Sequence, residues 1–160
     1  MTQAVDKDKV IEILEYYSQI DGNVKLYRNM IKDIELQYYD PRGAICTDGL
    51  PKGKNNISRQ TENMVLNIPD CVSKDLKRLE AKVQQLQTLK SQILQEVSRL
   101  KLKEKSIIFD FYIHAMKWEQ VAERNHYSER QCKNIRNAAV EKLIMKFQSN
   151  RTICEFDYTS

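Results

Sequence analysis

Residues 118–135 read WEQVAERNHYSERQCKNI, and this stretch decides the fold. A short helical pattern begins near Trp118, and a longer one follows after a polar turn at residues 125–127. Ser128 stands directly before the longer pattern, where a serine oxygen commonly accepts a hydrogen bond from the first helical turn. We therefore predict a short helix, a tight turn and a longer helix that runs from Ser128 to about Phe147.

Apolar spacing around this stretch predicts how three helices pack. An earlier helix carries Ile107, Ile108, Phe111 and Tyr112 on one apolar face. The small Ala122 would let the second and third helices cross closely, with Val121 and Tyr127 filling the contact. The buried stripe of the third helix is expected to comprise Cys132, Ile135, Ala139, Leu143 and Phe147.

Polar and charged side chains fill the opposite face of the third helix. Arg and Lys can donate to guanine, Asn and Gln can bond adenine bidentately, and Glu can accept from cytosine. A merely solvated face is the alternative, but the preceding turn pattern favours a helix that enters the DNA major groove. With the capping serine, the predicted DNA-contacting residues of this helix are Ser128, Glu129, Arg130, Gln131, Lys133, Asn134, Arg136 and Asn137.

Positive charge is concentrated in the same part of the chain. Residues 1–99 carry 15 Lys and Arg against 14 Asp and Glu, whereas residues 100–151 carry 11 against 6. The tail, residues 152–160, has a net charge of −2 from Glu155 and Asp157. This distribution favours an anionic partner for residues 100–151.

Two long heptad seams precede this region, and each predicts one long helix. In the second seam Lys90 occupies a core position. It could set register or oligomeric state, but we favour a wider stripe that includes Leu89 and Leu94 while the Lys90 side chain snorkels to solvent. The first seam comprises Val10, Ile13, Tyr17, Ile20, Val24, Tyr27, Ile31, Ile34 and Tyr38, and the second Val72, Leu76, Leu79, Val83, Leu86, Ile93, Val97 and Leu100.

The predicted architecture is all-α. Residues 1–99 would form a long antiparallel helical hairpin with a polar connector at 40–70, and residues 100–150 a compact helix-turn-helix domain followed by a tail, 151–160. The connector is rich in Gly, Pro and Asn, and residues 61–68 could form one short helix within it. The seams could be used within this hairpin or for homo-oligomerisation through the long helices, and both uses stay open.

Several classes of protein are disfavoured by what the sequence lacks. No apolar run reaches the length of about 20 residues that a membrane-spanning helix needs, and the start lacks a secretory signal pattern, so we expect a cytoplasmic protein without a membrane partner. The four cysteines form no C-x-x-C pair, and we expect no metal and no cofactor. No carboxylate pair or nucleophile–base set stands out, so we expect no enzymatic activity and no catalytic residue.

The segments beginning at Lys105, Trp118 and Tyr127 together resemble region four of bacterial sigma factors. They are more similar still to small phage and prophage transcriptional regulators of the ArpU and RinA type from Gram-positive bacteria. The specific resemblance covers residues 100–147. It implies double-stranded promoter DNA as the partner of the third helix, often beside RNA polymerase, in a bacterial host cell.

The resemblance also implies roles for single residues. Glu129, Arg130, Lys133 and Asn134 match positions that face bases or nearby phosphates, and Arg136 and Asn137 match the next exposed turn. Lys117 and Arg124 would contact phosphates beside the second helix. The chain departs from the pattern at four positions: Asn125 replaces a usual buried Leu, His126 and Ala115 replace usual glycines, and Lys117 replaces a capping Ser or Thr.

The resemblance therefore favours a sequence-specific, phage-derived regulator of late-gene promoters. We disfavour a complete sigma factor, because nothing in the sequence resembles an aromatic-rich promoter-melting region. The rival interpretations are a phage small terminase-like DNA-packaging subunit and a helical scaffold or adaptor that binds no DNA. A defined ring that stimulates a large ATPase subunit would favour the packaging subunit, and loss of all duplex affinity at low salt would favour the scaffold.

Overall fold

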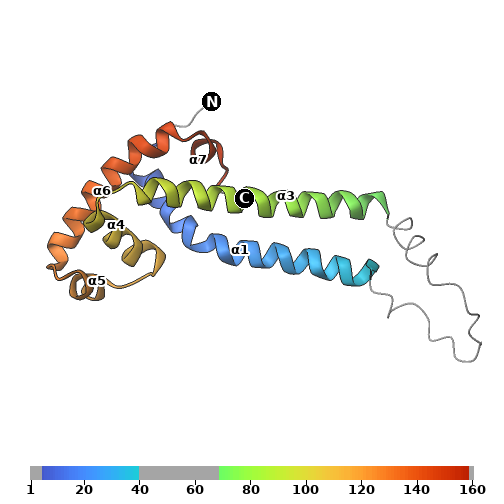
Figure 1. The fold of residues 1–160 in the computed structure, drawn as a ribbon, viewed down its shortest axis with the longest axis horizontal. Coiled ribbons are helices and arrows are strands. Elements are labelled where there is room, and N and C mark those ends of the chain that lie inside the picture. The colour runs from blue at the N-terminus through green and yellow to red at the C-terminus, as the bar shows by residue number, and fades with distance from the viewer. Residues whose placement is uncertain (1–4, 40–68, 159–160) are drawn as a thin grey trace, which may run out of the picture. The chain divides into compact units, whose positions relative to one another are not determined.

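The computed structural model describes residues 5–39 and 69–158, and every regular element in these ranges is helical. The predicted all-α fold is thereby confirmed, whereas the predicted helix at 61–68 lies outside the described residues. Figure 1 shows the elements: α1 (Lys7–Tyr39), α3 (Asp70–Ser98), α4 (Leu102–Ile108), the π-helical segment η2 (Phe109–Ile113), α5 (Trp118–Asn125), α6 (Glu129–Ser149) and α7 (Arg151–Glu155).

The chain divides into two compact units. The first unit comprises residues 1–23 and 85–160, and the second comprises residues 24–84. The first unit therefore joins the beginning of α1 to the end of α3 and to all the shorter helices. The predicted boundary between residues 99 and 100 falls inside this unit.

In the first unit, α1 and α3 bury the apolar stripes that their heptad spacing predicts. Val10, Ile13 and Ile20 of α1 are almost wholly inaccessible to solvent, as are Ile93 and Val97 of α3. Figure 1 shows that α1 and α3 run antiparallel, as expected for a helical hairpin. Leu14 is also fully buried, although it lies outside the predicted seam, so the apolar stripe of α1 is wider than two positions per heptad.

Lys90 behaves as a snorkelling residue in this packing. Its ammonium lies 2.5 Å from Oδ1 of the exposed Asp21 on α1 and 5.8 Å from the centre of the Tyr17 ring. Leu89 takes the adjacent core position and is fully buried, as the wider-stripe interpretation predicts. Leu94 differs from that prediction because it is 37% exposed.

In the second unit Val24 is still buried, but the seams beyond it are only half-buried. Tyr27 and Ile31 of α1 have intermediate exposure, as do Leu76 and Leu79 of α3.

No described helix combines the length and the apolar content that crossing a membrane requires.

The C-terminal tail packs within the first unit. Asn150 caps α7 by accepting a hydrogen bond from the N–H of Ile153, and the Ile153 side chain is fully buried. Beyond α7, Tyr158 packs edge-on against Tyr16 of α1, with ring centres 5.3 Å apart, and its hydroxyl donates to the Ile153 carbonyl. The sequence provided no prediction of this docking.

Candidate nucleic-acid interface

Helices α5 and α6, with the turn between them, form a helix-turn-helix arrangement built on the predicted apolar contacts. Val121, Ala122 and Cys132 are buried in one cluster with Ile107 of α4. Partly buried side chains complete the cluster: Phe111, Met116, Trp118, Tyr127 and Ile135. Burial also raises the pKa of the Cys132 thiol, with Glu129 adding to the effect, so this cysteine behaves as a core residue.

The turn after α5 is closed by two backbone hydrogen bonds. The N–H of Tyr127 donates to the Ala122 carbonyl at 3.1 Å, and the N–H of His126 donates to the Glu123 carbonyl at 3.3 Å. This pair of bonds is the Schellman motif, which requires a left-handed residue between the helix and the exiting chain. His126 supplies it with φ of 57°, so the turn forms without the glycine common in the resembled family.

Both helix starts are capped, by different means. The Ser128 hydroxyl accepts from the Gln131 N–H at 3.3 Å, which confirms the predicted start of α6. At α5 the preceding Lys117 gives no side-chain cap, but the Gln120 side chain accepts from the Lys117 N–H at 3.1 Å. The Gln120 side chain, inside α5, therefore compensates in part for the capping Ser or Thr that Lys117 replaces.

Asn125 belongs to a polar network instead of the usual apolar contact. Its Nδ2 donates to Asp110 Oδ2 at 2.8 Å and to the Val121 carbonyl at 2.9 Å, while its Oδ1 accepts from the Ser106 hydroxyl at 2.7 Å. Asp110 is only 4% exposed at its side chain and also lies 3.3 Å from Arg124 Nη1. Asn125 and Asp110 thus have partners in this network, which avoids the desolvation cost of about 1–3 kcal/mol for an unsatisfied polar group.

A short π-helical segment orients the residues that precede α5. In η2 the N–H of His114 donates to the Phe109 carbonyl, and the N–H of Met116 reaches the Asp110 carbonyl at 3.0 Å. Between them Ala115 adopts a left-handed conformation with φ of 51°. The π-helical segment and the left-handed Ala115 together turn the chain from α4 toward α5. No local spacing in the sequence predicts this π-helical segment.

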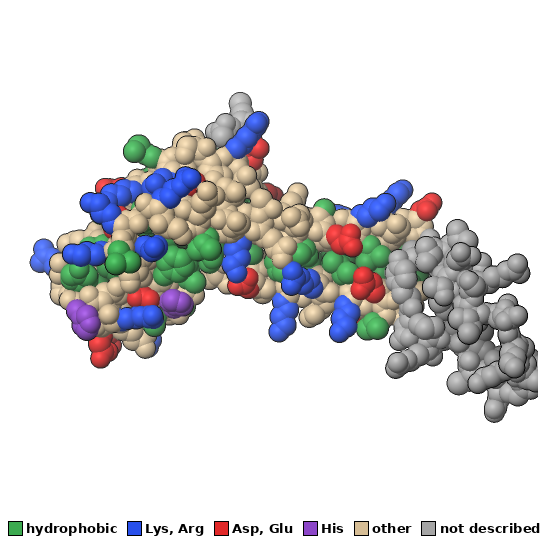
Figure 2. Space-filling view, in the orientation of Figure 1, with side chains coloured by type: hydrophobic (Ala, Val, Ile, Leu, Met, Phe, Trp, Pro, Cys, Tyr) green, Lys and Arg blue, Asp and Glu red, His purple; other side chains and the backbone are tan. Residues whose placement is uncertain are grey.

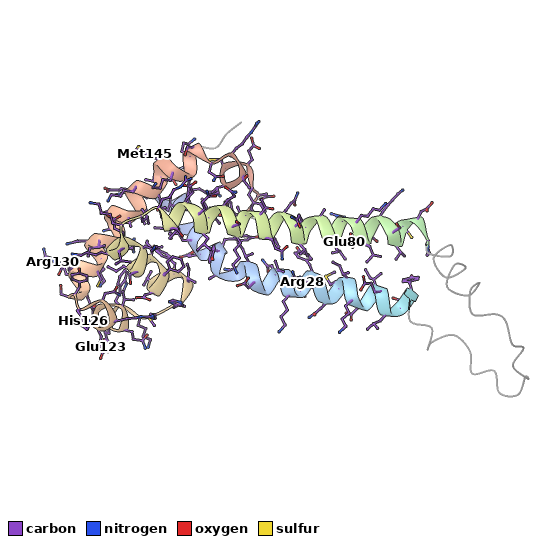
Figure 3. All side chains as sticks on the ribbon, viewed as in Figure 1. Arg28, Glu80, Glu123, His126, Arg130 and Met145 are labelled. Atoms are coloured by element: carbon purple, nitrogen blue, oxygen red, sulfur yellow. The ribbon has the colours of Figure 1, made fainter. Side chains whose placement is uncertain are left out.

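The structure places most predicted DNA-contacting residues on the surface around the start of α6. Figure 3 shows Arg130 there, with Glu123 and His126 nearby at the end of α5. Several Lys and Arg side chains lie over the region of α4, α5 and α6, among hydrophobic side chains, His and a few Asp and Glu (Figure 2). The exposed predicted residues are Lys117, Arg124, Ser128, Glu129, Arg130, Gln131, Lys133, Asn134 and Asn137, whereas Arg136 is half-buried.

The charged residues of this surface differ in how far they are already engaged. Lys133 lies 3.6 Å from Glu129 Oε2, one turn earlier on α6, and Arg124 lies beside Asp110. No ion pair involves Arg130 among the described residues. In this part of the chain Arg130 is thus the cation of α6 that is most available to an external anion, and Asn134 lies one turn further along the same face.

Among residues 5–39 and 69–158, no cluster of three His, Cys, Asp or Glu side chains could hold a metal ion. Comparison with known proteins found no match to any family model, any curated protein or any solved structure.

Proposed function

We propose that this chain is a sequence-specific double-stranded DNA-binding regulator of transcription and that α6 enters the major groove. The observation that carries the proposal is the solvent-exposed face at the start of α6, where Arg130, Gln131 and Asn134 project beside a closed turn. The cap and the Schellman turn fix this end of α6, which limits the entropy lost when it binds.

The net positive charge of residues 100–151 supports the same partner. A polyanion such as duplex DNA gains affinity from each phosphate that a Lys or Arg neutralises, and that gain weakens as salt rises. The resemblance to phage regulators supports a role at late-gene promoters beside RNA polymerase. Homo-oligomerisation through the long helices also remains an expectation from the sequence.

The test begins with selection of bound fragments from random or bacterial genomic DNA, followed by fluorescence anisotropy on the selected duplex. Arg130→Ala and Asn134→Ala should each weaken binding by roughly 5- to 150-fold, because a lost bidentate base contact costs about 1–3 kcal/mol. The wild-type affinity should fall linearly with salt on logarithmic axes, with a slope of about −0.9 for each phosphate contacted.

Arg28→Ala is the matched control, because Arg28 is an exposed arginine on the part of α1 that belongs to the second unit. It removes the same charge and should leave affinity almost unchanged. Equal affinities for Arg130→Ala and the wild type would reject the assignment of Arg130. A flat salt response, or no duplex binding at low salt, would reject DNA as the partner.

A further inference from the structure

Two aromatic rings form a rigid platform beside α6. Phe111 of η2 and Trp118, the first residue of α5, stack with their ring centres 4.1 Å apart and their planes inclined by 21°. Tyr112 packs edge-on against Phe111 at 5.0 Å. The stack joins η2 directly to the start of α5, so it ties the helix before the turn to the element that precedes it.

Arg136 of α6 lies over both rings of this platform. Its Cζ is 5.9 Å from the centre of the Phe111 ring and 5.8 Å from that of Trp118. Both distances fall within the range of about 6 Å in which a cation is attracted to an aromatic face. Its Nε is buried and has no hydrogen-bond partner among the described residues, so this edge of the guanidinium faces the protein.

Lys133 differs from Arg136 although it lies one turn away. Its ammonium is 5.6 Å from the Trp118 ring, but the side chain is 48% exposed and lies near Glu129. A flexible, exposed ammonium can turn toward a phosphate at little cost, whereas a planar guanidinium held on two rings cannot leave without losing its stacking.

Helix geometry separates Arg136 from Asn134, although the sequence pattern predicts that both contact DNA. Successive residues of an α-helix are rotated by about 100°, so Arg136 projects roughly 200° away from Asn134, two positions earlier. The side of α6 that carries Arg136 is therefore almost opposite to the side that carries Asn134.

We propose that Arg136 is a positioning residue: it braces α6 against the Phe111–Trp118 platform and so fixes which face of α6 is presented to DNA. The contact of Arg136 with the two rings is present in the free protein, without DNA. Its consequence for duplex affinity rests on the proposed function, with Arg130 and Asn134 as the residues that it orients.

The experiment compares Arg136→Gln, Arg136→Lys and the control Arg130→Gln. Trp118 is the only tryptophan of the chain, so tryptophan emission and its quenching by acrylamide report on the platform without a label. Both Arg136 variants should shift the emission of the DNA-free protein and weaken duplex binding by roughly three- to tenfold, with an unchanged salt slope. Arg130→Gln should leave the emission unchanged and make the slope shallower by about 0.9.

The charge-conserving variant distinguishes a brace from a phosphate contact. Wild-type affinity in Arg136→Lys, together with a shallower slope in Arg136→Gln, would make Arg136 a phosphate contact and overturn the proposal. Unchanged Trp118 emission in both variants would also overturn it. Far-UV circular dichroism checks folding, and if Arg136→Gln loses helix content, Arg136→Lys decides the question. If the wild type binds no duplex, the proposed function fails while the emission measurement still tests the brace.

Discussion

Ala115 and His126 both adopt positive φ, at 51° and 57°, and they stand at two positions where the resembled family commonly has glycine. A left-handed conformation costs a residue with a Cβ about 1–2 kcal/mol relative to the right-handed helix, whereas glycine adopts it freely. The helix-turn-helix of this chain therefore keeps its turn geometry despite an unfavourable residue at each position, because the surrounding hydrogen bonds and apolar contacts fix the backbone.

Replacing His126 with glycine should stabilise the protein. We expect His126→Gly to raise the free energy of unfolding by about 1 kcal/mol, because the side chain is exposed and the backbone strain is removed. Urea titration followed by circular dichroism measures the change. His126→Ala is the control, since alanine keeps the cost of the left-handed conformation. Equal stabilisation by both variants would show that the imidazole, not the backbone, is the cause.

The hydrogen-bond partners of Asn125 could not be predicted from its position in the sequence. A polar residue where Leu is usual in the resembled family weakens the sequence signal for the turn. Its partners Ser106 and Asp110 lie 19 and 15 residues earlier, and they reach it only after the π-helical segment has turned the chain. Side-chain pairing between elements depends on how the helices are rotated relative to one another, which local spacing does not specify.

At the level of helices, the best-predicted boundaries are those with a chemical signal at the end. The start of α6 follows from its capping Ser128, and the buried positions of α1 and α6 follow from apolar periodicity. Helix α7 was not predicted, because five residues are too few to show the apolar periodicity of a helix. Its signal was the capping Asn150 before an isolated apolar Ile153, which is weak by itself.

The docking of α7 should give the protein a distinct loss of stability at alkaline pH. Burial, with a smaller effect from Cys154, raises the pKa of Tyr158 far above its usual value of about 10. The folded state thus retains the phenol proton that the unfolded state loses, so Tyr158 stabilises the fold fully below about pH 10 and less as the pH rises above it. Tyr158→Phe has no such proton, so its urea midpoint should fall less than that of the wild type between about pH 8 and pH 11. Parallel losses in the two proteins would contradict the assignment.

Across the whole chain, the first compact unit is assembled from segments that are far apart in sequence. The N–H of Val5 donates to Gln148 Oε1 of α6, and Lys7 forms an ion pair with Glu141 at 2.9 Å. Asn150 at the end of α6 also donates to Gln92 of α3. The helix-turn-helix therefore shares its packing with α1 and α3, although the sequence pattern that identifies it is confined to residues 100–147.

A fragment containing only residues 100–150 should accordingly be unstable. We expect it to lose the cooperative thermal transition of the full chain, because α6 loses its polar contacts with Val5, Lys7 and Gln92. Calorimetry of the fragment and of the full chain measures this difference. Addition of a peptide spanning residues 1–23 to a fragment of residues 85–160 is the control, and it should restore part of the transition. A cooperative transition at the full-chain midpoint in the short fragment would show that the helix-turn-helix folds alone.

The discontinuous unit also has a consequence for biosynthesis. The ribosome releases α1 well before residues 85–158, so the side chains of Val10 and Ile13 emerge without the surfaces that later cover them. Until then the nascent chain presents an amphipathic helix of the kind that chaperones bind. Folding of this unit therefore finishes only after α7 and Tyr158 have left the exit tunnel.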